Sequence, residues 1–324
     1  MTTIINLLKI SRPVNLAIVI STMYVLRFFI IKPIIASTCL GMKLQMSEFD
    51  FFISVMVVVL LTAAGNIIND YFDVKVDKIN KPDRVLIGTK VKRRVAMVAH
   101  QSMNILAVLL SVYLCMKFDS WKPLAIPVSI ATLLWFYSPF FKKQIFIGNL
   151  VVAFCVSIVP IWTGVFEIPE ILKEYGDVHS NPKALQSTLW LWILAYSCFA
   201  FLLSLSREAL KDLEDLMGDT QGKYHTMPIA IGEKWTRFYA AALMTSCLFA
   251  VGFVFTEAGL SIKKDVNASV FTLILVILPG TFTIMRTLSA RSKNHYSVAS
   301  LLAKTTMAGG IILCLLAGTY LWSC

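Results

Sequence analysis

The stretch FFISVMVVVLLTAAGNIINDYFDVKVD, residues 51–77, joins a long apolar run directly to a series of acidic side chains. A helix that crosses a bilayer needs about 20 mostly apolar residues, and the chain contains nine runs of this kind. They cover roughly 14–35, 50–69, 94–116, 122–138, 147–166, 187–206, 236–256, 267–286 and 299–322. The runs do not alternate polar and apolar residues as the strands of a membrane barrel do. The sequence therefore predicts an all-α polytopic membrane protein with nine transmembrane helices, folded as a single domain over residues 1–324.

The composition and the charge distribution agree with a membrane protein. Hydrophobic residues make up 57% of the chain and charged residues 15%, which is outside the usual balance of a soluble domain. When nine spans are threaded with the N-terminus in the cytoplasm, most basic residues fall on the cytoplasmic side. Topology thus explains the net charge of +11, and no nucleic-acid partner is expected. We expect an integral protein of the cell or inner membrane, with its N-terminus and active site on the cytoplasmic side.

Two acidic stripes stand out, each directly after an apolar run. The first stripe is Asn66, Asp70, Asp73 and Asp77, and the second stripe is Glu208, Asp212, Asp215 and Asp219. Steps of four, three and four residues keep the side chains of each stripe on one face of a helix. Carboxylates crowded on one face repel one another, so the pattern indicates a strongly positive guest between the stripes. Oxygen ligands of this kind suit Mg²⁺; the alternative is a pair of solvated helix ends.

A metal-bound diphosphate explains the stripes better than solvation does. Facing acidic helices can hold metal ions that bridge a diphosphate and neutralise the charge that develops as it leaves. Basic residues near the stripes are candidates for contacts with the remaining phosphate oxygens, and these are Arg84, Lys142 and Lys211. The seven cysteines and four histidines form no metal-ligand or redox constellation.

Four motifs resemble the UbiA superfamily of intramembrane prenyltransferases. Asn69-Asp70-x-x-Asp73-x-x-x-Asp77 is similar to its NDxxDxxxD signature, and Asp215-x-x-x-Asp219 to its second, DxxxD motif. YSPFFKK, residues 137–143, resembles the element of the family in which a tyrosine and a lysine follow the fourth helix. Arg12-Pro13-x-Asn15 is similar to the N-terminal signature. The resemblance runs over most of the chain.

The resemblance implies a fold, a reaction and a set of site residues. Nine helices would surround a central cavity that opens to the lipid, where Mg²⁺ binds an isoprenyl diphosphate and an acceptor captures the allylic carbocation. The residues implied as catalytic are Asp70, Asp73, Asp77, Asp212, Asp215 and Asp219, and these together with Asn69 would bind the metal. The residues implied in substrate binding are Asn15, Asn66, Asn69, Arg84, Tyr137, Lys142 and Lys211.

The acceptor is the least determined part of this expectation. The motifs look most like the geranylgeranylglycerol-phosphate geranylgeranyltransferase branch, which implies geranylgeranyl diphosphate and the hydroxyl of a prenylglycerol phosphate in ether-lipid synthesis. VLIGTKVKRR, residues 85–94, departs from that branch, where this loop is rich in Pro, Ser and Gly. An aromatic acceptor of a quinone, haem or tocopherol-like pathway is the alternative. An ion-coupled transporter is a remote alternative, because transporter sites lie near the bilayer midplane, whereas these acids lie at the ends of the apolar runs.

Overall fold

The computed structural model describes residues 2–38, 40–177, 179, 181–257 and 266–321, and these residues are almost entirely helical. Within those ranges, the one strand-like feature is an isolated bridge between Ile87 and Val91. The all-α prediction is confirmed.

The α-helices are α1 (Thr2–Ile10), α2 (Pro13–Leu26), α3 (Lys32–Ala36), α4 (Glu48–Asn80), α5 (Arg93–Lys117), α6 (Ala125–Tyr137), α7 (Ile147–Gly164), α8 (Glu167–Tyr175), α9 (Pro182–Glu214), α10 (Leu216–Gln221), α11 (Met227–Ile231), α12 (Glu233–Glu257), α13 (Val266–Thr272), α14 (Leu278–Ser289) and α15 (Lys293–Leu321). Short 3-10 or π segments are η1 (Arg27–Ile31), η2 (Pro82–Arg84), η3 (Lys122–Leu124), η4 (Phe141–Lys143) and η5 (Leu273–Ile277).

Eight of the described helical segments are long and apolar enough to cross a membrane. They are Pro13–Ala36, Glu48–Asn80, Arg93–Lys117, Ile147–Tyr175, Pro182–Glu214, Glu233–Val254, Ser269–Ser289 and Lys293–Leu315. A ninth apolar segment, Lys122–Tyr137, is shorter; it covers about 24 Å, against about 30 Å for the hydrocarbon core. Each segment overlaps one of the predicted runs, so the prediction of a polytopic helical membrane protein is confirmed.

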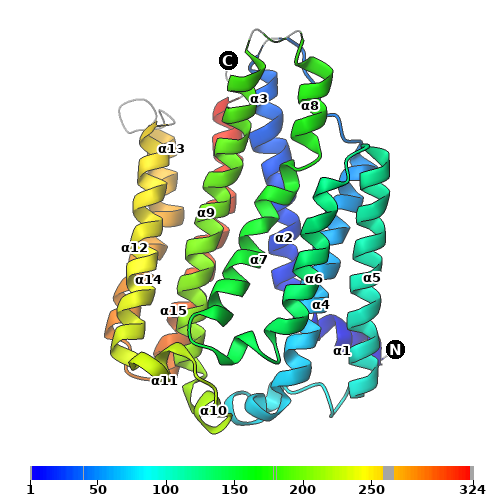
Figure 1. Ribbon diagram of the computed structural model, residues 1–324. Coiled ribbons are helices and arrows are strands. Elements are labelled where there is room, and N and C mark those ends of the chain that lie inside the picture. Colours follow the sequence, from blue (N-terminus) through cyan, green and yellow to red (C-terminus); the bar gives the residue numbers. More distant parts are fainter. Residues whose placement is uncertain (1, 39, 178, 180, 258–265, 322–324) are drawn as a thin grey trace.

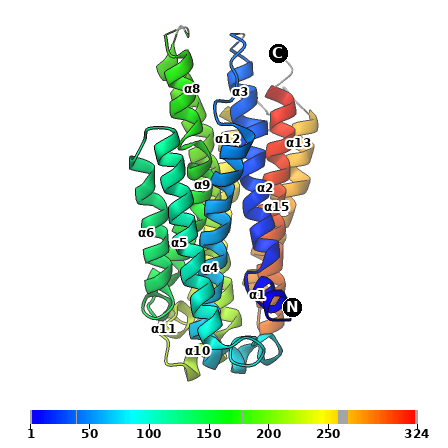
Figure 2. The same ribbon diagram turned by 90° about the vertical axis from the view of Figure 1, so that its right-hand side faces the viewer.

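The long helices stand side by side in both views of the ribbon (Figures 1 and 2). The short helices α1, α10 and α11 lie together at one end, and α8 lies at the other. The C-terminal ends of α4 and α9 reach the end that holds α1, α10 and α11, which we call the motif end because both stripes lead to it.

The helix α4 carries the first stripe without interruption. It begins at Glu48 because Ser47 caps it, its hydroxyl accepting from Asp50 N at 3.1 Å. It ends at Asn80, two residues before Pro82. A proline disfavours helical geometry in the residue before it, which here is Lys81. Its 33 residues span about 50 Å, so α4 extends beyond an apolar layer of about 30 Å.

The second stripe differs from the prediction of one continuous helical face. The helix α9 ends at Glu214, Asp215 has a non-helical backbone (φ −97°, ψ 6°), and α10 begins at Leu216. Glu208 and Asp212 therefore share α9, whereas Asp219 lies on the short α10. The expectation that all four side chains share one helix was wrong at this point.

The side chain of Asn80 accounts for the break after α9. Its Nδ2 donates to the backbone oxygen of Asp215 over 3.0 Å, and its Oδ1 accepts from Gly218 N over 2.9 Å. Backbone groups at a helix end need such partners when they are buried. A long-range contact, which the local spacing of acids does not reveal, thus ends α9.

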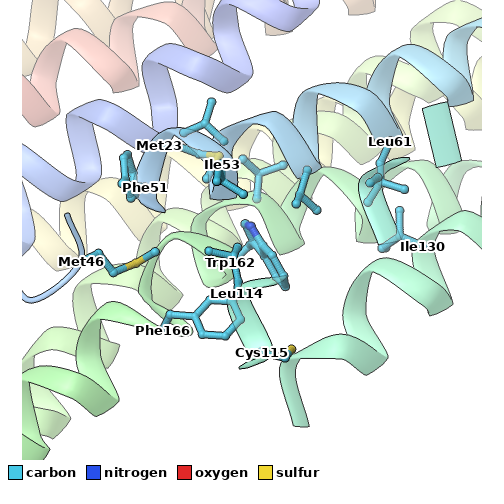
Figure 3. Packing of buried hydrophobic residues seen from close by; sticks show 14 residues of the cluster. Met23, Met46, Phe51, Ile53, Leu61, Leu114, Cys115, Ile130, Trp162 and Phe166 are labelled. Atoms are coloured by element: carbon cyan, nitrogen blue, oxygen red, sulfur yellow. The ribbon is translucent and has the colours of Figure 1, made fainter. Parts of the chain in front are cut away.

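A tightly packed cluster near Trp162 of α7 holds α4, α5 and α7 together. Figure 3 shows Trp162 among Ile53, Leu114 and Phe166. The Trp162 and Phe166 rings meet edge to face with centroids 5.5 Å apart, and Trp162 Nε1 donates to Ser54 O over 3.1 Å. The indole is therefore both packed and hydrogen-bonded, which fixes α7 against α4.

A fully buried ion pair connects the first span, Pro13–Ala36, to the span Ile147–Tyr175. Arg27, at the start of η1, donates from Nε to Glu167 Oε2 over 3.0 Å, and both side chains are 0% exposed. Glu167 also accepts from Met46 N over 3.0 Å, and the Arg27 guanidinium stacks over Phe51 at 4.3 Å. The pair thereby ties the loop before α4 to η1 and to α8.

Candidate active site

A partly open cavity of about 260 Å³ is lined by residues of α2, α4, α6, α7, α9 and α15. Most of its wall is apolar, with Val57, Leu61, Ile130 and Val159 among the lining residues. Eight of the predicted site residues also line it: Asn15, Asn66, Asn69, Tyr137, Lys142, Lys211, Asp212 and Asp215. The cavity is thus apolar on some walls and highly polar on others.

The other predicted acids are not part of the cavity lining. These are Asp70, Asp73, Asp77 and Asp219, and each is near at least one other site residue. The side chain of Arg84 lies outside the described part of the chain, and its backbone forms the end of η2.

Lys142 is the counter-ion of the first stripe. Its ammonium forms a close ion pair with Asp73, a buried residue of α4, and lies 3.4 Å from Asn69 Oδ1. Burial opposes the charged form, but the carboxylates of Asp73 and Asp77 outweigh it and raise the pKa of Lys142 well above its ordinary value. The ammonium group therefore stays charged beside the stripe.

Arg12 is a second counter-ion of the first stripe. It lies just before α2 in the left-handed backbone region (φ 56°), and its Nη2 donates to Asp70 Oδ1 over 2.8 Å. Asn66 Nδ2 donates to Ser11 O over 3.0 Å, which holds the same turn against α4. Burial disfavours the charged guanidinium, yet Asp70 outweighs this and raises the pKa of Arg12.

The second stripe has its own cations and one amide partner. Glu208 pairs with Arg207 and with Lys211, each at 2.9 Å. Asp212 accepts from Asn149 Nδ2 of α7 over 2.8 Å. Asn149 belongs to the stretch GNLVVA, and its amide fixes the direction in which Asp212 points.

Lys81 joins the ends of the two stripe helices. It follows α4 directly, and its Nζ lies 2.9 Å from Asp215 Oδ1 and 3.3 Å from Glu214 Oε1. Burial lowers the pKa of Lys81, but Asp215 and Glu214 outweigh the burial and raise it. Together with Asn80, Lys81 holds Asp215 close to the C-terminal end of the first stripe.

Asp219 and Asp77 complete the acidic group at the motif end. Burial, followed by the carboxylates of Asp215 and Asp73, raises the pKa of Asp219 to about 7, although Lys142 opposes the shift. Asp77 lies close enough to Asp73, Asp70 and Asp215 for their charges to act on it. Acids of both stripes therefore repel one another across the site.

The donor set at the motif end fits Mg²⁺. No group of three or more His, Cys, Asp or Glu residues in the described ranges is arranged to hold a metal ion by itself. Mg²⁺ commonly uses one or two carboxylates and completes its octahedron with phosphate oxygens and waters, so this arrangement suits it. Asp73 Oδ1 is buried and has no hydrogen-bond partner among the described residues, which leaves a carboxylate oxygen available as a ligand.

A model of the UbiA prenyltransferase family matches residues 30–306. The chain belongs to the UbiA prenyltransferase family. The family suggested by the motifs is thereby confirmed. Among curated UbiA relatives, digeranylgeranylglyceryl phosphate synthase of Thermococcus kodakarensis is 31% identical over 231 residues, 71% of this chain and 73% of the relative. The synthase of the same name from Pyrococcus abyssi is 30% identical over 243 residues, 74% of this chain and 76% of the relative.

Solved structures show that the UbiA fold extends over nearly the whole chain. A structure described as digeranylgeranylglyceryl phosphate synthase in membranes covers 99% of this chain, with a TM-score of 0.64 and 23% identity. A UbiA homologue from Archaeoglobus fulgidus, bound to DMAPP and Mg²⁺, covers 95% with a TM-score of 0.54 and 14% identity. At these identities the likeness is one of fold.

Four polar residues of this UbiA cavity were missed as site residues by the sequence reasoning. They are Arg12, which lies in the N-terminal motif but was given no role, and Asn149, Arg207 and Lys304. Lys304 lies inside the last apolar run and lines the cavity. A lysine in the interior of a span is costly and marks function by default, so this signal was available.

Proposed function

We propose that this UbiA family member transfers a prenyl group from a prenyl diphosphate, with Mg²⁺, to the hydroxyl oxygen of a prenylglycerol phosphate. The observation that carries the proposal is the placement of Lys142 and both acidic stripes beside an apolar cavity among membrane-spanning helices. The charged end of a prenyl diphosphate matches the stripes and their cations, and its hydrocarbon tail matches the aliphatic walls.

The predicted metal ligands fit this role. They are Asn69, Asp70, Asp73, Asp77, Asp212, Asp215 and Asp219. Bound Mg²⁺ would neutralise the diphosphate and stabilise the charge that develops as it leaves. Lys142 and Lys81 pair with Asp73 and Asp215, two of the predicted metal ligands. A diphosphate bound to those metal ions would therefore be close enough for both ammonium groups to donate to its oxygens. Arg84 stays a predicted diphosphate contact.

The transfer replaces one C–O bond with another and frees a proton. The allylic C1–O bond breaks, its electron pair leaves with the diphosphate, and a lone pair of the acceptor hydroxyl forms the new C1–O ether bond. The hydroxyl proton is released, so the products are the ether, diphosphate and one proton. Walls such as Val57, Leu61 and Ile130 exclude water that would otherwise capture the carbocation.

The acceptor and the donor chain length in this proposal come from the named relatives. Digeranylgeranylglyceryl phosphate synthases are about 30% identical to the chain over most of its length, which supports geranylgeranyl diphosphate as donor and a geranylgeranylglyceryl phosphate as acceptor. The test is incubation of purified protein with Mg²⁺, geranylgeranyl diphosphate and a panel of acceptors, followed by mass spectrometry. We expect the ether product; exclusive alkylation of an aromatic acid would assign the aromatic alternative, and flux through liposomes without transfer would assign a transporter.

The active site is proposed to face the cytoplasm. The loop 81–94 at the motif end carries Lys81, Arg84, Lys90, Lys92, Arg93 and Arg94, and cytoplasmic loops are enriched in Lys and Arg. A cysteine introduced at the exposed Lys92 should react with a membrane-impermeant maleimide only after intact cells are permeabilised. Labelling of intact cells above that of the parent chain would reverse the orientation.

A further inference from the structure

Resting on the proposed function, we propose that Arg207, Lys304 and Lys211 form a separate subsite for the phosphate monoester of the acceptor. The three side chains line the cavity, together with Arg12 and Glu208. This proposal moves Lys211, which the sequence suggested as a diphosphate contact, to the acceptor. The subsite would explain how one cavity receives two phosphorylated lipids without exchanging their roles.

The charges of this cluster are not balanced. Arg207 and Lys211 share one carboxylate, Glu208, with both ion pairs at 2.9 Å. Arg12, whose charge also acts on Glu208, already has Asp70 as its partner at 2.8 Å. An excess of positive charge therefore remains on this wall of the cavity.

Lys304 is the residue that most requires an anion. It lies in the interior of the candidate span Lys293–Leu315, where a charged side chain is costly. In the part of the chain that the structure describes, no carboxylate lies within ion-pair distance of its ammonium. The positive charges of Arg207, Lys211 and Arg12 act on it, and the charge of Glu208 opposes them. Among the described residues, Lys304 therefore has no carboxylate close enough to pair with it.

Arg207 offers a second donor for a bound anion. Its Nη1 is occupied by Glu208, but its Nε is buried and has no hydrogen-bond partner among the described residues. A buried guanidinium N–H without a partner is costly unless a ligand satisfies it. Arg side chains recognise phosphate through charge-assisted hydrogen bonds, and a phosphate monoester offers three acceptor oxygens.

The cluster of Arg207, Lys304 and Lys211 is distinct from the lysines that pair with Asp73 and Asp215. Lys142 is held by Asp73 and Asn69, and Lys81 by Asp215 and Glu214. Tyr137 lines the same cavity and is near enough to both groups for the charges of Lys142 and Glu208 to act on it. A diphosphate with its metals at Asp73 and Asp215 leaves the Arg207 and Lys304 side chains for a second anion.

A phosphate monoester matches the cluster better than a carboxylate does. At neutral pH a monoester carries a charge of about −1.5 to −2, which offsets the surplus cations more fully than the single charge of an aromatic acid. The subsite therefore selects prenylglycerol phosphates against both neutral prenylglycerols and aromatic acids.

The test measures binding in phosphatidylcholine nanodiscs without prenyl diphosphate, so it does not depend on turnover. The probes are geranylgeranylglyceryl phosphate and the same lipid without its phosphate. Wild type should bind the phosphorylated lipid at least tenfold more tightly. Lys304→Met should remove most of that preference, and Lys304→Arg should retain it because the charge is kept. Arg291→Met, which removes an exposed cation at the motif end, is the matched control and should keep the wild-type preference.

Steady-state kinetics provide a second measurement. Lys304→Met should raise the KM for the phosphorylated acceptor about tenfold while the KM for geranylgeranyl diphosphate stays within about twofold. If Lys304→Met fails to fold, Arg207→Gln takes its place. We expect Arg207→Gln to raise the KM for the phosphorylated acceptor and to leave the KM for geranylgeranyl diphosphate nearly unchanged.

Three results would overturn the subsite. One is equal binding of the two lipids by wild type, and another is an unchanged preference in Lys304→Met. The third is equal competition by dioleoyl phosphatidic acid, which would assign the cluster to bulk lipid phosphate rather than to the acceptor. Failure of the proposed function looks different: wild type would show the binding preference but transfer no prenyl group to any glycerol phosphate.

Discussion

Asn80, the last residue of α4, accepts a hydrogen bond from Gly218 N of α10 over 2.9 Å. Asn80 also donates to Asp215 O over 3.0 Å, so one side chain connects the end of the first stripe helix to the break in the second. A Cβ added at Gly218 would lie 2.4 Å from Asn80 Nδ2. The contact requires glycine at 218 because the amide of Asn80 occupies the space of a side chain.

Substitutions at this contact should weaken metal binding more than they weaken the fold. Gly218→Ala displaces Asn80, and Asn80→Ala leaves a buried Gly218 N–H without its partner, at a cost of about 1–3 kcal/mol. We expect the Mg²⁺ concentration for half-maximal activity to rise about tenfold in either variant. Gly252→Ala is the control, since a Cβ there meets nothing within 4 Å. Unchanged Mg²⁺ dependence in Gly218→Ala would show that the contact does not position Asp215.

Lys142→Met should lower kcat/KM for the prenyl diphosphate by about 100-fold or more, a typical cost of losing one charge-stabilising donor. The neighbouring Lys143→Met is a matched control, because the Lys143 ammonium lies over the Tyr224 ring at 5.6 Å instead of on Asp73. Steady-state kinetics of both variants measure the difference. Similar losses in the two would point to general surface charge and away from a specific contact.

Asp73→Asn and Asp215→Asn should each abolish turnover while the protein stays folded in detergent. Each removes a carboxylate that faces a lysine, Lys142 or Lys81, and with it a predicted metal ligand. Product formation by mass spectrometry and thermal unfolding of the same samples measure the two effects. Near-normal activity in either variant would refute the metal role of that residue.

Metal affinity should rise with pH around neutrality. Because the pKa of Asp219 is raised to about 7 in the metal-free protein, a proton competes with the metal below that pH. We expect the dissociation constant of Mn²⁺, titrated into substrate-free protein, to fall as pH increases from 6 to 8. Well below pH 7 the affinity should weaken about tenfold per pH unit if one proton is displaced. An affinity that is independent of pH across this range would exclude Asp219 as a ligand.

The Arg27–Glu167 pair should matter for stability and leave the chemistry intact. Glu167→Gln removes one partner of a fully buried ion pair, which typically costs about 3–5 kcal/mol. The Tm in detergent should fall, with the KM for the prenyl diphosphate within about twofold of wild type. Glu48→Gln is the control, because Glu48 also contacts Arg27 at 3.2 Å but its side chain is 69% exposed. An equal fall in Tm in the two variants would show that burial of the pair does not determine its contribution to stability.

The sequence predicted those parts of the molecule that depend on local patterns. The apolar runs identified the spans, and the spacing of Asn66, Asp70, Asp73 and Asp77 correctly placed all four on one helix. Span edges were less well predicted, because α4 and α9 continue past their apolar runs into the polar motifs. Apolar content marks where a helix is inside lipid, and the helix itself ends where its backbone finds other partners.

Contacts between distant segments could not be predicted from the same patterns. The break at Asp215 depends on Asn80, 135 residues earlier in the chain, and the ion pair between Arg12 and Asp70 depends on how α2 packs against α4. The spacing of the acids indicated that they need positive partners, and metal ions were the partners predicted from it. The structure shows that Lys142, Lys81 and Arg12 also fill that need.

The length of α4 and α9 gives the proposed reaction a direction. Each helix is 33 residues long, about 50 Å, and so extends past an apolar layer of about 30 Å. The proposed diphosphate site near their C-terminal ends would therefore lie at the boundary between lipid and water. Diphosphate would then depart into water, while the new ether lipid stays in the bilayer. Once the two products are diluted into different phases, the reverse reaction needs both to return to the same boundary site at once. Phase separation of the products thus favours net synthesis without any further device in the protein.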